Sequence, residues 1–111
     1  MDTIFAQATA RGKAGVSIVR LSGPDAFATA RRFVGGLPEP RKTGLRRFVD
    51  PEGNLVDQAL VVCFASGHSF TGEDVVEFHL HGSPAVLSKV LSCLTAVPGC
   101  RLADAGEFTR R

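Results

Sequence analysis

The sequence predicts an α+β domain in which helices pack on a mixed or antiparallel β-sheet. Three observations predict this fold: runs rich in β-branched residues, two stretches with apolar residues at helical spacing, and turns with glycine or proline between them. The chain has 111 residues, of which 44% are hydrophobic and 22% charged. This length and composition suit one globular domain spanning residues 1–111.

Two hairpins are predicted from the strand candidates. Residues 3–8 and 16–22 can pair across the glycine-containing turn at 11–15. Residues 45–49 and 55–65 flank a second turn that contains proline and glycine. The nearly continuous apolar run at the end of 55–65 is typical of a central strand covered on both faces.

The first helix is predicted to start within Ser22–Asp25 and to end at the glycines 35–36. Ser22 or Gly23 can cap it, and Pro24 suits its first turn. Its apolar face carries five residues at helical spacing: Ala26, Phe27, Ala30, Phe33 and Val34.

The second helix is predicted to start at Pro84, with Ser83 as its cap, and to stop at 97–99. A short edge strand at 100–103 follows. Residues 106–111 look like a loop entering a helix, so we expect this chain to be a piece of a longer protein.

One strand carries an unusual row of titratable groups. After a polar turn at 69–74, residues 75–81 place Val76, Phe78 and Leu80 on one face and Glu77, His79 and His81 on the other. Such a row on a half-buried strand costs desolvation free energy unless it is paired. The partner can be the protein itself, a metal ion or a ligand.

The residues leave these three alternatives open. A metal site of Glu77, His79 and His81 has a known ligand set, but its spacing is common by chance and no H-E-x-x-H pattern occurs. Glu77 can instead accept the adjacent N–H groups of a pterin-like ring, while Arg20 meets an anionic part of the same ligand. Pairing of Glu77 with Arg20, His79 or a backbone N–H is slightly favoured over the metal site and over the pterin site.

Other activities lack their motifs. The sequence has no P-loop, no G-x-G-x-x-G and no G-x-S-x-G pattern, so GTP hydrolysis is not expected from this chain and no catalytic residue is assigned. The net charge of +2 is too small for a protein that grips nucleic acid by itself. Three dibasic pairs, at 31–32, 41–42 and 46–47, are interpreted as solvated.

The cysteines and the hydropathy of the sequence indicate in which cellular compartment the protein works. The three cysteines, an odd number without C-x-x-C spacing, do not suggest a disulfide framework or a zinc site. Reduced thiols point to the cytoplasm. No signal peptide is visible, and no stretch approaches the about 20 apolar residues of a membrane helix.

Several phrases together resemble one family. They are D-T-I with A-Q-A-T near the start, G-V-S-I-V-R-L-S-G at 15–23, S-F-T-G-E-D-V-V-E at 69–77 with H-G at 81–82, and G-E-F-T-R-R at 106–111. In order and spacing the chain resembles the N-terminal domain of the tRNA-modification GTPases called MnmE or TrmE. Two departures are A-R at 10–11, where the family has P-P, and G-S-P at 82–84, where it has G-G-P.

The resemblance implies a fold similar to the tetrahydrofolate-binding domain of aminomethyltransferases. It implies a homodimer that binds 5-formyltetrahydrofolate or methylenetetrahydrofolate through Arg20 and Glu77, with a lysine past Arg111 as a third contact. In the full-length family member it implies GTP, Mg²⁺ and K⁺, an FAD-dependent MnmG-type partner, and tRNA modified at its wobble uridine. No membrane partner and no resident metal in this domain are implied.

Overall fold

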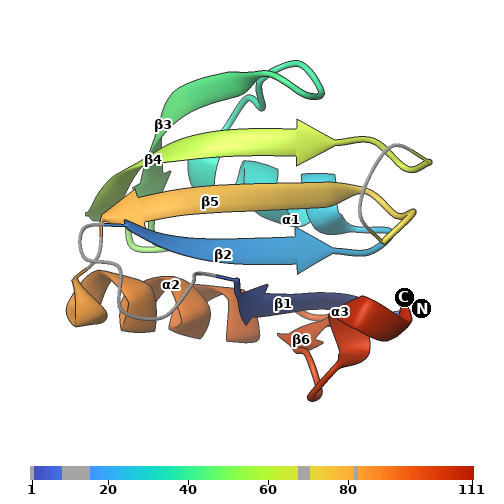
Figure 1. The fold of residues 1–111 in the computed structure, drawn as a ribbon. Helices are drawn as coiled ribbons and strands as arrows, with labels where there is room; N and C mark the ends of the chain where they lie inside the picture. Colours follow the sequence, from blue (N-terminus) through green and yellow to red (C-terminus); the bar gives the residue numbers. More distant parts are fainter. Residues whose placement is uncertain (1, 9–15, 68–70, 82) are drawn as a thin grey trace.

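The computed structural model describes residues 2–8, 16–67, 71–81 and 83–111. These residues form one six-stranded sheet with the strand order β3-β4-β5-β2-β1-β6, accompanied by helices (Figure 1). The elements in chain order are β1 (Thr3–Gln7), β2 (Val16–Ser22), α1 (Ala26–Val34), β3 (Thr43–Val49), β4 (Leu55–Phe64), β5 (Val75–His81), α2 (Pro84–Thr95), β6 (Cys100–Leu102) and α3 (Glu107–Arg110).

The sheet is mixed, as predicted. Both expected strand pairs form, since β1 pairs antiparallel with β2 and β3 pairs antiparallel with β4. The predicted turn at 11–15 lies outside the described residues. The strand β5 lies between β4 and β2 and is antiparallel to both. Only the short β6 runs parallel to its neighbour, β1, among the described strands. The α+β fold class predicted from the sequence is therefore confirmed.

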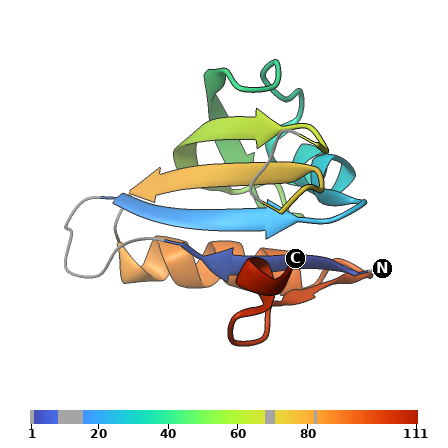
Figure 2. The same cartoon turned by 45° about the vertical axis from the view of Figure 1, so that its right-hand side comes forward.

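Helices α1 and α2 pack on the same apolar core of the sheet. In Figure 1 and Figure 2, α1 lies behind β5, and α2 runs below β2 and passes partly behind β1. The core between the helices and the sheet is apolar and includes a cluster of aromatic rings. The Phe48 ring stacks on Phe33 at a centroid distance of 5.0 Å and meets Phe78 edge-on at 5.4 Å. We call the opposite side of the sheet, which carries Arg20, Glu77 and Leu60, the open face.

The prediction that β4 is covered on both faces is wrong. Ala59, Val61 and Cys63 are buried beneath the helices, but Leu60 on the open face keeps 39% of its surface exposed. The apolar run is continuous because the open face is itself partly apolar, and not because a second layer covers it.

The start of α1 also differs from the prediction, because Ser22 stays in β2 and the helix begins at Ala26 after Asp25. The hydroxyl of Thr3 accepts a hydrogen bond from the Asp25 N–H at 3.0 Å and takes over the capping role. Gly23 has φ +149°, and a Cβ there would lie 2.6 Å from the Cα of Thr3. Glycine is required for this close approach. In α2, by contrast, Ser83 and Pro84 occupy the predicted positions.

None of the helices in the described ranges is long and apolar enough to cross a membrane.

All three cysteines are buried free thiols, and burial raises the pKa of the Cys100 thiol to about 11. Cys63, Cys93 and Cys100 are therefore inert apolar core residues at neutral pH.

Candidate functional site

An ion pair occupies the centre of the open face. Arg20 on β2 and Glu77 on β5 are directly opposite each other in the antiparallel ladder, so their side chains project to the same side. The Nε and one terminal nitrogen of Arg20 donate to Oε2 of Glu77 at 2.8 and 2.7 Å. The Arg20 and Glu77 side chains are only 28% and 15% exposed, so the pair is largely desolvated.

His79 completes this cluster. Its Nε2 lies 3.1 Å from Oε1 of Glu77, so both oxygens of the carboxylate have a partner within the chain. Burial alone would raise the pKa of Glu77, but the hydrogen bonds from Arg20 and His79 outweigh it and lower the pKa. Glu77 is therefore an anion at neutral pH. The slightly favoured prediction, that Glu77 pairs with Arg20 or His79, is confirmed.

The row of titratable groups divides into two separate sites. The ring of His81 turns to Asp57, with 2.8 Å between its Nδ1 and Oδ1 of Asp57, and the backbone N–H of His81 donates to Oδ2. Glu77, His79 and His81 thus share no common centre. Among the residues that the structure describes, no group of three or more His, Cys, Asp or Glu side chains is arranged to hold a metal ion.

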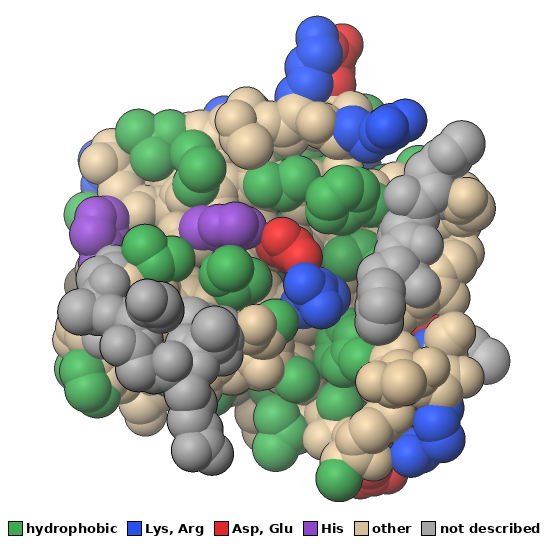
Figure 3. Space-filling model, in the orientation of Figure 1, with side chains coloured by type: hydrophobic (Ala, Val, Ile, Leu, Met, Phe, Trp, Pro, Cys, Tyr) green, Lys and Arg blue, Asp and Glu red, His purple; other side chains and the backbone are tan. Residues whose placement is uncertain are grey.

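A hollow of about 280 Å³ adjoins the cluster on the open face. Its lining is mostly apolar and includes both histidines: Val16, Leu45, Gln58, Leu60, His79, Leu80 and His81. Figure 3 shows this face, with histidine, acidic and basic side chains side by side in the middle and hydrophobic side chains around them. Val16, at the start of β2, and Leu45, on the edge strand β3, are 47% and 59% exposed, so the hollow is bordered by exposed apolar side chains.

The turn at residues 71–74 sets the direction in which β5 enters this site. Gly72 takes a positive φ of 83°, which glycine adopts without steric cost. The Ser22 hydroxyl lies 2.7 Å from Oγ1 of Thr71 and donates to Oε1 of Glu73 at 3.0 Å. Oδ1 of Asp74 accepts the backbone N–H of Ser66 at 2.8 Å. These bonds fix the turn to β2, two residues from Arg20.

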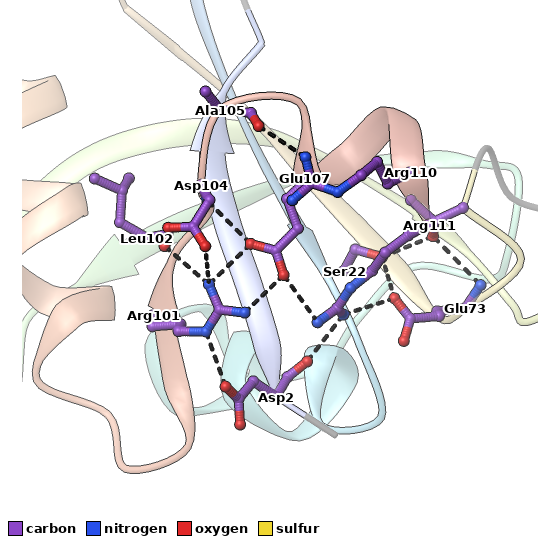
Figure 4. A network of polar contacts seen from close by, with 11 residues as sticks. Asp2, Ser22, Glu73, Arg101, Leu102, Asp104, Ala105, Glu107, Arg110 and Arg111 are labelled. Carbon is purple, nitrogen blue, oxygen red and sulfur yellow. Dashed lines mark hydrogen bonds and ion pairs between the residues drawn. The ribbon is translucent and has the colours of Figure 1, made fainter.

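A second polar network joins this turn to both chain ends (Figure 4). Arg111 donates to Glu73 at 2.9 Å and to the backbone carbonyl of Asp2 at 2.9 Å. Glu107 accepts two hydrogen bonds from Arg101, at 2.8 and 2.6 Å. These bonds and the Asp104 N–H lower the pKa of Glu107 to about 2.

Sequence reasoning missed this network. Its one sequence signal is the spacing of Glu107 and Arg111, which are four residues apart on a predicted helix. The remaining partners are distant in the sequence, and Asp2 and Arg101 meet only because β6 pairs with β1.

Comparison with known proteins identifies the family. A family model described as "GTP-binding protein TrmE N-terminus" matches residues 3–111. The chain belongs to the TrmE N-terminus family. The resemblance inferred from the sequence motifs is therefore confirmed.

Relatives of this TrmE N-terminal domain carry the name tRNA modification GTPase MnmE. The proteins of Roseobacter denitrificans and Dinoroseobacter shibae are 57% and 54% identical to it over 111 residues, and one from Cereibacter sphaeroides is 57% identical. In each case all of this chain is matched, but only 26% of the relative. The chain thus spans about a quarter of the length of these relatives.

Proposed function

We propose that this domain binds a reduced folate, 5-formyltetrahydrofolate or methylenetetrahydrofolate, on its open face. The observation that carries the proposal is the largely desolvated pair of Arg20 and Glu77 beside the apolar hollow. Ligand sites combine apolar walls with a few polar groups that fix orientation. When bound, the folate would supply a one-carbon unit.

The donor and acceptor chemistry of the pair suits this ligand. A pterin ring presents a ring N–H next to an exocyclic amino group, and the ionised Glu77 carboxylate can accept both. A carboxylate has about four lone-pair positions, of which Arg20 and His79 use three. Because both Arg20 hydrogen bonds are to Oε2, a pterin that bonds to both oxygens would take Oε2 from Arg20 and use the remaining position on Oε1 beside His79. Arg20 would then turn toward the anionic part of the folate.

We propose further that the domain forms a homodimer through the open face. Val16, Leu45 and Leu60 expose apolar surface there, and a second copy would cover it. Because the folate site lies on the same face, dimerisation would also exclude water from Glu77.

The activity proposed for the whole protein extends beyond this chain. Its relatives are named tRNA modification GTPases, and we infer that the whole protein modifies the wobble uridine, position 34, of certain tRNAs in the cytoplasm. It would do so with an FAD-dependent MnmG-type partner and with GTP, Mg²⁺ and K⁺. This chain contains no P-loop. We therefore propose that GTP is hydrolysed by a part of the whole protein other than this domain.

A second candidate is a dimerisation domain that binds no ligand. One observation favours it, because both oxygens of Glu77 already have protein partners. In the described residues no buried side-chain nitrogen or oxygen lacks a partner that a ligand would have to supply.

Calorimetry with 5-formyltetrahydrofolate separates the two candidates. Saturable binding that is lost in Glu77→Ala supports the folate site. A dimer in sedimentation experiments that shows no heat of folate binding supports the ligand-free domain.

A further inference from the structure

A strongly basic segment of the chain lies along the edge of the sheet that is formed by β3. Residues 31–47 contain six of the thirteen Lys and Arg residues but only one acid, Glu39. The other 94 residues carry seven basic and ten acidic residues. The small net charge of +2 therefore conceals one positively charged segment on an otherwise acidic chain. We call the cationic side chains of this segment the basic edge: Arg31, Arg32, Arg41, Lys42, Arg46 and Arg47.

The fold brings the three dibasic pairs together. Arg31 and Arg32 lie in the last turn of α1, which packs against β3. The Nε of Arg46 on β3 donates to the carbonyl of Gly36 at 2.7 Å, just past the end of that helix. The backbone N–H of Arg41 donates to Cys63 on β4 at 2.7 Å, which anchors the turn before β3. The pairs at 41–42 and 46–47 thus share one edge, and the pair at 31–32 lies beside it at the end of α1, where Arg32 lines a hollow with Pro51 and Cys93.

Acidic side chains do not neutralise this edge. Glu39 lies 3.1 Å from Lys42, but both side chains are more than 70% exposed, so this pair is weak. At the far end of β3, Asp50 accepts the N–H groups of Glu52 and Asn54, and the neighbouring Asp57 is bonded to His81. In Figure 3, Lys and Arg side chains project at the top, where Figure 1 places the turn that leads into β3, with one acidic side chain beside them.

Protection of an edge strand against aggregation does not account for this charge. Charged side chains on the edge strand itself serve that purpose. Here four of the six cations lie outside β3, and five of the six are arginine. The planar guanidinium forms paired hydrogen bonds with phosphate and is favoured where nucleic acid is recognised.

We infer that the basic edge binds the phosphate backbone of an RNA helix. Arg46 and Arg47 are adjacent on a strand and so point to opposite sides of the sheet. The cations therefore border an edge about 20 Å long for a seven-residue strand. A ridge with charge on both sides fits between the phosphates of a helical groove, whereas a flat membrane surface would need the cations on one face.

This inference does not depend on the folate site, and it adds an RNA-contacting surface to the proposed tRNA-modifying function. Arg41 and Arg47 lie on the basic edge, whereas Arg110 lies on α3 and Lys89 lies on α2 with its Nζ 3.7 Å from Asp50. The double variants Arg41→Gln/Arg47→Gln and Lys89→Gln/Arg110→Gln lose the same charge. They form a matched pair for the test.

The test is fluorescence anisotropy of a labelled RNA stem-loop with the 111-residue chain at 50 to 200 mM KCl. If four phosphates are contacted, this increase in salt weakens binding by on the order of 100-fold in the parent chain. It weakens binding by on the order of 10-fold in the edge variant, which keeps two contacts. The Lys89→Gln/Arg110→Gln control should keep the parent affinity and salt dependence. Circular dichroism verifies that each variant is folded.

Three outcomes would overturn the inference. They are no binding of the stem-loop at 50 mM KCl, equal losses in the edge and control variants, and tighter binding of phosphatidylserine vesicles or polyglutamate than of RNA at equal charge. Calorimetry with folate on the edge variant tests the folate site separately from RNA binding. The Arg41→Gln/Arg47→Gln variant should lose RNA affinity and keep its folate affinity, so either proposal can fail without the other.

Discussion

Replacing Arg20 by methionine tests the ion pair at the centre of the open face. The substitution removes both hydrogen bonds to Oε2 of Glu77 and leaves only the contact with His79. Methionine keeps much of the aliphatic volume of arginine, so packing changes little. The expected effect is a loss of stability from a carboxylate that stays ionised in a poorly solvated position.

The magnitude follows from the partial burial of the pair. Fully exposed pairs contribute about 0–1 kcal/mol, and removing one partner of a buried pair costs about 3–5 kcal/mol. Side-chain exposures of 28% and 15% place Arg20 and Glu77 between these limits. The expected loss is therefore about 1.5–3 kcal/mol in the free energy of unfolding.

Urea denaturation at pH 7 measures this loss. The matched control is Lys42→Met, which breaks the exposed pair with Glu39 and should cost less than about 0.5 kcal/mol. In a double-mutant cycle, Arg20→Met/Glu77→Met should recover part of the loss, because no unpaired carboxylate remains. Equal, small effects of Arg20→Met and Lys42→Met would refute the reasoning.

Two further predictions concern the C-terminal network and the dimer. Glu107→Gln should lower the urea midpoint at pH 6–7. Because the folded pKa of about 2 lies below the ordinary value of 4.5, the difference from the parent should shrink as the pH falls from 4.5 toward 2; a pH-independent difference would contradict this. Leu60→Asp should convert the proposed dimer into a monomer in analytical ultracentrifugation, whereas Leu102→Asp, an exposed leucine outside the open face, should leave it intact. A dimer that survives Leu60→Asp would exclude this interface.

The sequence predicted the features that depend on neighbours in the chain. The hairpins follow from β-branched runs and short turns, and the two faces of β5 follow from strand alternation. The pairing of Glu77 with Arg20 or His79 was one of three alternatives. The structure supports it, because the ladder places Arg20 directly across from Glu77.

Features that depend on long-range packing were missed. The exposure of Leu60 is set by both helices crossing the same side of the sheet, which the apolar run of β4 does not encode. The cap of α1 comes from Thr3, which is 22 residues from Asp25. Arg111 reaches Glu73 across 38 residues because the chain returns beside β1.

The most direct test of the central proposal is calorimetric titration with 5-formyltetrahydrofolate. The protein should continue past Arg111, so that the lysine expected from the family is present, and its Glu77→Ala variant should be titrated alongside. Saturable binding by the parent that weakens at least about 10-fold in Glu77→Ala, as loss of a charge-assisted hydrogen bond implies, is the predicted result. Undiminished binding by Glu77→Ala, or no binding by the parent, would contradict the proposed folate site.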